Sequence, residues 1–118
     1  MNVVDTSGWI EFFIASPAGE HYQAVIIDTA TLLVPALSLY EIHRYFSSKI
    51  TSTELATVLD VVRQAQVIPL TDERAIAASK VAQQHKLAMA DAIMYATALE
   101  FNATFWTQDI DYAGLPSV

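Results

Sequence analysis

The chain has 118 residues and a mass of 13.0 kDa, which suits one domain covering residues 1–118. Apolar residues make up 53% and charged residues 16%, a balance that excludes intrinsic disorder. Cysteine is absent, which excludes a disulfide framework, a thiolate zinc site and a cysteine nucleophile. The net charge of −7 argues against loose, charge-driven binding to nucleic acid, but not against a nucleic-acid substrate held through bound cations.

The sequence also bears on the location of the protein. No apolar run approaches the roughly 18 residues of a membrane-spanning helix. The segment from Met1 to Asp5 does not have the composition of a signal peptide. We therefore expect a cytoplasmic protein with no membrane partner.

Short apolar runs alternate with longer segments of helical character along the chain, and glycine and proline fall where elements begin or end. The β-branched run at residues 2–5 ends in a carboxylate and predicts a buried strand. The full set of expected strands is 2–5, 31–34, 66–70 and 104–107, and the expected helices are 7–14, 17–27, 36–49, 52–64, 72–85 and 91–101.

Several element boundaries carry their own signals. Ser16 and Pro17 predict a cap and the first residue of a helix. Thr51 and Glu54 have the spacing of a capping box at the start of another helix. Pro69 indicates an edge strand or the end of a strand, because proline cannot donate to a neighbouring strand.

Strands separated by helices predict parallel pairing through right-handed crossovers, so we expect an α/β fold whose sheet is covered on both faces. Open sheets of this class bind their ligands at the carboxyl ends of the strands. Asp5 and Asp109 each follow a predicted strand. The two residues therefore point to one site at this edge of the sheet.

Four acidic residues stand at strand ends or in apolar surroundings: Asp5, Glu41, Asp91 and Asp109. Each also has a structural explanation. Asp5 and Asp91 suit helix caps. Glu41 suits an ion pair with Arg44, and Asp109 suits an Asx turn. Together the four are harder to explain in this way, because isolated carboxylates are costly to bury unless they are paired or bound to metal.

Converging carboxylates, with no cysteine and only scattered histidines, favour a hard, oxygen-preferring cation such as Mg²⁺ or Mn²⁺. A cation held in this way lowers the pKa of bound water, orients a phosphodiester and stabilises the charge that develops on it. The sequence has no glycine-rich phosphate loop and no dinucleotide-binding fingerprint. Because the four carboxylates repel one another, we expect at least one raised pKa when no cation is bound.

Four segments resemble, in this order and approximate spacing, the signature segments of PIN domains. The similarity is greatest to the VapC-type toxins of bacterial and archaeal toxin–antitoxin pairs. The segments are VVDTS at 3–7, SLYEIHR at 38–44, LAMADAI at 87–93 and WTQDIDY at 106–112. The resemblance implies a three-layer fold in which a small parallel sheet of four to five strands is flanked by helices. It also implies an Mg²⁺- or Mn²⁺-dependent endoribonuclease that forms a homodimer and is held inactive by a cognate antitoxin.

The resemblance further implies roles for individual residues. The catalytic quartet it implies is Asp5, Glu41, Asp91 and Asp109, of which Asp5, Asp91 and Asp109 would be the metal ligands. The secondary or substrate-binding positions it implies are Thr6, Ser7, Arg44, Thr107 and Asp111.

Two other classes of function compete with a ribonuclease toxin. A non-catalytic PIN-like interaction module would carry a vestigial acidic site, but such a module need not keep all four acids. A receiver-type domain with a phosphorylated aspartate needs a second acid beside Asp5 and a lysine after a late strand, and neither is present. The sequence therefore predicts a metal-dependent ribonuclease that hydrolyses RNA phosphodiester bonds.

Overall fold

The computed structural model describes residues 1–109 and 112–116, and within these ranges the chain forms one parallel sheet. Its strands are β1 (Asn2–Val4), β2 (Leu32–Pro35), β3 (Gln66–Ile68) and β4 (Thr104–Trp106). The strand order is β3–β2–β1–β4, so β1 and β2 occupy the centre and β3 lies at an edge, as Pro69 predicts. Val3 lies opposite Leu33 on one side and Phe105 on the other.

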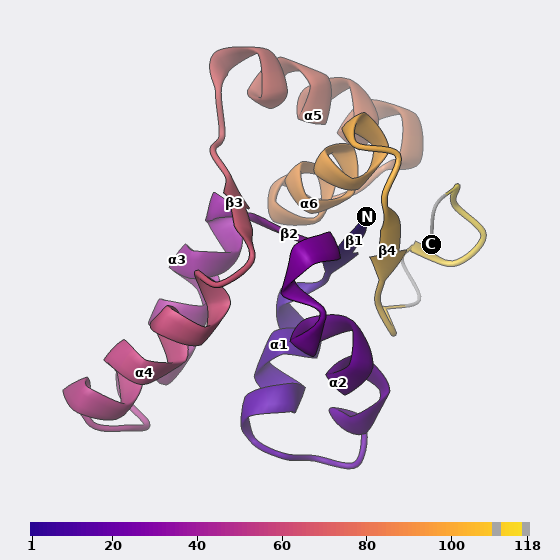
Figure 1. The fold of residues 1–118 in the computed structure, drawn as a ribbon. Helices are drawn as coiled ribbons and strands as arrows, with labels where there is room; N and C mark the ends of the chain where they lie inside the picture. Colours follow the sequence, from indigo (N-terminus) through magenta and orange to yellow (C-terminus); the bar gives the residue numbers. More distant parts are fainter. Residues whose placement is uncertain (110–111, 117–118) are drawn as a thin grey trace.

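Six α-helices flank the sheet within the same ranges: α1 (Thr6–Phe13), α2 (Glu20–Ile27), α3 (Ala36–Phe46), α4 (Ser52–Val62), α5 (Asp72–His85) and α6 (Met89–Glu100). In Figure 1, α5 and α6 lie together on one side of the sheet, and α1 and α2 lie on the opposite side with α3 and α4 beside them. The predicted α/β class and parallel sheet are thus confirmed. Throughout the described ranges, each helix is too short or too polar to cross a bilayer.

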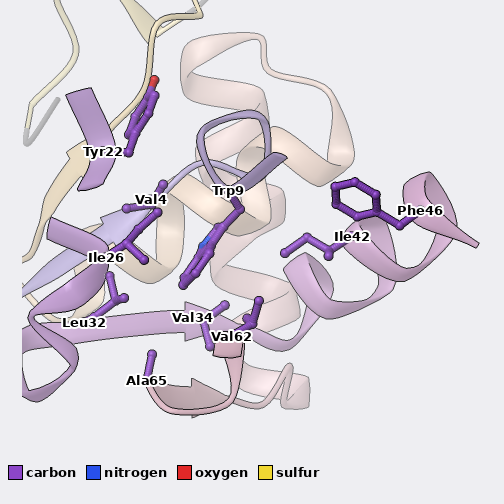
Figure 2. Close-up of a cluster of buried hydrophobic side chains, with 10 residues drawn as sticks. All are labelled: Val4, Trp9, Tyr22, Ile26, Leu32, Val34, Ile42, Phe46, Val62 and Ala65. Carbon is purple, nitrogen blue, oxygen red and sulfur yellow. The ribbon is translucent and has the colours of Figure 1, made fainter. Parts of the chain in front are cut away.

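The central strands bury side chains on both faces, which explains why the core has two layers. Val3 and Leu33 belong to the apolar cluster beneath α6. Val4 and Val34, their neighbours in sequence, belong to the cluster covered by α1–α4. Successive side chains of a strand point to opposite faces, so a strand with helices on both sides has no polar positions until it ends. Figure 2 shows the second cluster, with Trp9 in its middle.

The predicted capping box of α4 is present, and α5 also begins with a cap. Thr51 Oγ1 accepts from the backbone N–H of Glu54 at 3.1 Å, and Glu54 Oε1 accepts from the backbone N–H of Thr51 at 3.0 Å. Thr71 Oγ1 accepts from the backbone N–H of Arg74 at 3.2 Å. These bonds satisfy N–H groups that have no partner inside the helix, so both helices begin where the sequence predicts.

α2 begins at Glu20, three residues later than predicted. Ser16 acts as a cap, since its Oγ accepts from the backbone N–H of Gly19 at 3.1 Å. The next N–H groups, however, bond to carbonyls three residues back, which makes a tight turn instead of an α-helix. A Cβ on Gly19 would collide with the carbonyl oxygen of Glu11, so this turn packs directly against α1.

α6 and α3 also differ from the prediction. α6 begins at Met89 with Ala88 in the N-cap position, so Asp91 lies inside the first turn and does not cap the helix. α3 ends at Phe46 instead of Lys49, whose backbone N–H bonds to a carbonyl only three residues back. The earlier start of α6 matters for the site, because it turns Asp91 from a boundary residue into a side chain on the helix surface.

Candidate active site at the carboxyl edge of the sheet

Asp5 follows β1 directly and holds the N-cap position of α1, but its side chain makes no capping bond. Instead, Asp5 Oδ2 accepts from Ser7 Oγ at 3.2 Å and from Thr107 Oγ1 at 2.9 Å. The backbone N–H of Asp5 donates to the carbonyl of Trp106 at 3.0 Å, which continues the pairing of β1 with β4 and brings Thr107 alongside. The side chain of Asp5 therefore does not act as a helix cap. The residue is buried, with only 8% of its surface exposed.

Burial raises the pKa of Asp5 above its ordinary value of 3.8. The hydroxyls of Thr107 and Ser7 act against this rise, because they donate to the charged carboxylate. The negative charge of Asp91 adds to the rise, which means that Asp91 lies nearby. A raised pKa is thus found at one of the four acids, but its main cause is the removal of the carboxylate from water. Repulsion between the acids is the smaller cause.

Three of the four acids act electrostatically on the hydroxyl of Tyr112, a fully buried side chain. Burial, followed by the charges of Asp5, Asp91 and Asp109, raises the pKa of Tyr112 well above its ordinary range. The side chain of Asp91 lies close enough to the Tyr112 hydroxyl to add a hydrogen-bonding contribution to this rise in pKa. The end of β1, the first turn of α6 and the segment after β4 therefore place Asp5, Asp91 and Asp109 within electrostatic range of one buried hydroxyl.

Thr107 organises the segment after β4. Its Oγ1 accepts from the backbone N–H of Asp109 at 3.0 Å while donating to Asp5. The local turn is thus closed by the Thr107 hydroxyl, a side chain two residues before Asp109. One threonine therefore connects two of the predicted acids.

Glu41 reaches the same region from α3. Its Oε1 accepts from Thr6 Oγ1 at 2.7 Å, and Thr6 follows Asp5 in the chain. Ser38 Oγ lies 3.4 Å from Thr6 Oγ1 and donates to the sulfur of Met94 at 3.2 Å. Thr6 and Ser38 are both buried. These bonds connect α1, α3 and α6 just behind the acids, so the orientation of Glu41 depends on residues from all three helices.

Some of the predicted features differ in the structure. Glu41 does not pair with Arg44, whose Nη1 donates to the hydroxyl of Tyr40 at 2.9 Å. Asp111 lies outside the described residues. Within residues 1–109 and 112–116, no three acidic or histidine side chains are close enough to form a ready-made metal-binding group. The donors at this edge are all oxygen atoms, however, and this chemistry fits a hard divalent cation.

Tyr112 and Ser38 had no predicted role, although both fall inside the segments that resemble PIN domains. Ser38 is a polar residue in the apolar half of its helix, which is the same signal that singled out Glu41. Tyr112 offers no such signal, because an aromatic residue near the end of a domain is ordinary core material. Only its position among three carboxylates distinguishes it.

A groove of about 410 Å³ opens beside Glu41, between α1 and α3. Its walls combine the buried Thr6 with aromatic and basic side chains from the outer surface of α3. The lining residues are Thr6, Ile10, Tyr40, Glu41, Arg44 and Tyr45. Glu41 and Thr6 therefore belong both to the acidic region and to this groove.

Solved structures share this fold. A toxin–antitoxin complex from Klebsiella pneumoniae contains a chain with a TM-score of 0.85 and 21% identity, over 100% of this chain and 95% of that one. VapBC2 from Rickettsia felis, bound to a promoter DNA fragment, gives a TM-score of 0.74 and 15% identity, over 99% and 94%. FitAcB from Neisseria gonorrhoeae gives a TM-score of 0.69 and 16% identity, over 92% and 88%. At these identities the likeness is one of fold.

The sequence comparisons identify the family. No curated protein matches the sequence of this chain. The family model described as PIN domain matches residues 3–116, almost the whole length. This range contains all four acids that the sequence analysis singled out. The chain therefore belongs to the PIN domain family.

Proposed function

We propose that this protein is a metal-dependent endoribonuclease that hydrolyses RNA phosphodiester bonds at the carboxyl edge of its sheet. The observation that carries the proposal is that Asp5, Asp91 and Asp109 all lie within electrostatic range of the buried Tyr112 hydroxyl. A buried carboxylate is costly, and Asp5 holds the N-cap position of α1 without making a capping bond. The sequence resemblance to PIN ribonucleases supports the same assignment.

The residues present suit a bound Mg²⁺ or Mn²⁺ ion, which Asp5, Asp91 and Asp109 would hold. When bound, such an ion supplies positive charge to the phosphate and lowers the pKa of water. Thr107 and Ser7 hold the Asp5 carboxylate in place through their hydroxyls. Glu41 is suited to accept the proton of the attacking water, because its carboxylate is oriented by Thr6, the residue that follows Asp5.

The fold also supports a partner. The similar structures from Klebsiella pneumoniae and Rickettsia felis are a toxin–antitoxin complex and VapBC2. We propose that this chain is the toxin of such a pair and that an antitoxin blocks the acidic edge. Its net charge of −7 favours a basic partner segment. Co-expression with the product of the adjacent gene, followed by purification of the complex, tests this assignment.

Cleavage of a labelled, structured RNA by the purified protein tests the activity. We expect cleavage with Mg²⁺ or Mn²⁺, no cleavage in excess EDTA, and recovery when metal is restored. Asp91→Asn removes a carboxylate of the site and is expected to lower the rate by about a hundredfold or more.

Glu54→Gln is the matched control, because Glu54 is an exposed carboxylate in the capping box of α4. This variant should cleave at the wild-type rate. Cleavage that persists in EDTA would contradict a metal-dependent mechanism. A folded wild-type protein that cuts no RNA with either metal, yet binds the antitoxin, would favour the non-catalytic interaction module instead.

A further inference from the structure

The surface of α3 beside Glu41, together with the turn that follows this helix, carries two tyrosines and a pair of cations. Tyr40 is 58% exposed, and its hydroxyl accepts from Arg44 Nη1 at 2.9 Å. Lys49 Nζ lies 4.2 Å from the centre of the Tyr45 ring and donates to the Tyr45 carbonyl at 3.1 Å. Aromatic rings and positive charges therefore alternate along one strip, which we call the α3 strip (Tyr40, Arg44, Tyr45 and Lys49).

The charge of the α3 strip contrasts with that of the chain. The whole sequence has six Lys and Arg residues against thirteen Asp and Glu residues. Two of those six cations lie in the strip. Among the residues that the structure describes, Arg74 is the arginine in an ion pair, with Glu100 at 3.0 Å. Arg44 instead holds a neutral tyrosine hydroxyl, so its positive charge is not cancelled by a carboxylate and is available to an anion.

This chemistry suits one class of ligand. An exposed phenol ring gives a flat surface on which a nucleotide base can stack, and base–aromatic stacking does not depend on sequence. An arginine beside the ring binds a phosphate through its planar guanidinium. Only unpaired bases can lie flat on a side chain, so the ligand is single-stranded. The groove of about 410 Å³ that Tyr40 and Arg44 line falls in the size range of small-ligand sites.

We propose that the groove between α1 and α3 holds one nucleotide of single-stranded RNA, with its base on Tyr40 and its phosphate on Arg44. The proposal rests on the proposed ribonuclease function. Glu41 and Thr6 line the groove and also belong to the acidic region. A nucleotide in the groove therefore lies next to the phosphodiester that would be hydrolysed at the acidic site. Lys49, whose ammonium lies over the Tyr45 ring, adds a positive charge farther along the same surface.

Fluorescence anisotropy with a short, unstructured, labelled oligoribonucleotide tests the proposal. The measurements use full-length protein carrying Asp91→Asn, so that the RNA is bound without being cut. Adding Tyr40→Ala should raise the Kd about tenfold, because it removes one base-stacking surface. Tyr40→Phe keeps the ring and should stay within about threefold of its parent. Arg44→Gln should weaken binding and reduce the dependence of log Kd on log salt by about one phosphate contact.

Arg63→Gln is the matched control for charge, because Arg63 is an exposed cation at the end of α4 outside the groove. It should leave the Kd within about twofold of its parent. In the otherwise wild-type chain, Tyr40→Ala should raise KM for RNA cleavage and leave kcat nearly unchanged. Tyr40 is exposed, so its replacement leaves the core intact, and equal melting temperatures of Tyr40→Ala and Tyr40→Phe check this.

The outcomes separate this inference from the proposed function. If the wild-type protein cuts RNA but Tyr40→Ala and Arg44→Gln bind and cut as well as Arg63→Gln does, the nucleotide site is wrong and the ribonuclease stands. If the wild-type protein does not cut RNA, the proposed function itself fails. If Tyr40→Ala keeps its RNA affinity but loses affinity for the antitoxin, the groove docks a protein and the nucleotide assignment is overturned.

Discussion

The starts of α1 and α4 carry similar residues, but these residues form different hydrogen bonds. At α4, Thr51 and Glu54 exchange two hydrogen bonds with each other's backbone, and both side chains are exposed. At α1, Asp5 holds the N-cap position but bonds to Ser7 and to Thr107 from a distant strand. The start of α4 is closed by its own cap. At the start of α1, the Asp5 side chain makes no capping bond to the helix backbone and bonds instead to the hydroxyls of Ser7 and Thr107.

The two acids also differ in ionisation. Hydrogen bonds from the Thr51 backbone and side chain lower the pKa of Glu54, whereas burial raises the pKa of Asp5. A lowered pKa means that the folded state favours the charged carboxylate, and a raised pKa means that it disfavours it. Glu54 in its charged form therefore contributes to stability, whereas the charge of Asp5 weakens it.

The largest expected effect comes from Asp5→Asn. The substitution keeps the size of the side chain but removes its charge from the acidic site, so RNA cleavage should fall by about a hundredfold or more. Glu54→Gln makes the same chemical change at α4 and should leave the cleavage rate unchanged. Single-turnover cleavage with Mn²⁺ measures both. Equal losses in the two variants would mean that activity depends on general charge, not on the site.

Thr107→Val tests the long-range bond that distinguishes Asp5 from a cap. The valine keeps the shape of threonine but removes the hydrogen bond to Asp5 and the acceptor for Asp109 N–H. A hydrogen bond to a charged group contributes about 1.5–3 kcal/mol, so cleavage should slow by about tenfold or more. Thr107→Ser keeps the hydroxyl and should recover most of the rate. A wild-type rate in Thr107→Val would show that Asp5 needs no support from β4.

Thr51→Ala acts on the other helix start. Loss of the Thr51 cap from α4 should lower the free energy of unfolding by about 1 kcal/mol and leave RNA cleavage unaltered. Urea unfolding, monitored by circular dichroism, measures the free energy of unfolding. Under the same conditions, with EDTA present, Asp5→Asn should unfold at a higher urea concentration than wild type does. A lower midpoint for Asp5→Asn would mean that the charged carboxylate stabilises the fold.

The smallest expected effect is a difference in pH dependence. Asp5 has a raised folded pKa, so its contribution to stability is fully present below the ordinary value of 3.8 and is lost as pH rises through the folded pKa. Glu54 has a lowered folded pKa, so its contribution is present above the ordinary value of 4.5 and is lost as pH falls through the folded pKa.

With increasing pH in EDTA, Asp5→Asn should therefore gain stability relative to wild type, and Glu54→Gln should lose it. Urea unfolding at a series of pH values from about 3 to 7 covers both titrations. Parallel curves of unfolding free energy against pH for the two variants would mean that Asp5 and Glu54 have the same electrostatic effect on stability.

Local signals predicted much of the architecture. The spacing of Thr51 and Glu54 predicted the capping box of α4, and short apolar runs predicted the four described strands. The start of α2 was wrong by three residues, because the turn at Ser16–Gly19 is shaped by its contact with Glu11 of α1. No local pattern contains that contact. The start of α6 was wrong by two residues because Ala88, which carries no cap signal, holds the N-cap position.

The sequence alone determined which acids were candidates, since an unpaired carboxylate in apolar surroundings is costly and therefore conspicuous. Only the tertiary structure decided how they are held. Thr107 reaches Asp5 across 102 residues, and Thr6 reaches Glu41 across 35. Tyr112 gained its place among three charges only when β4 and α6 packed against β1. Hydrogen bonds and burial depend on distances in space, and residues far apart in the chain acquire those distances only when the sheet and helices pack together.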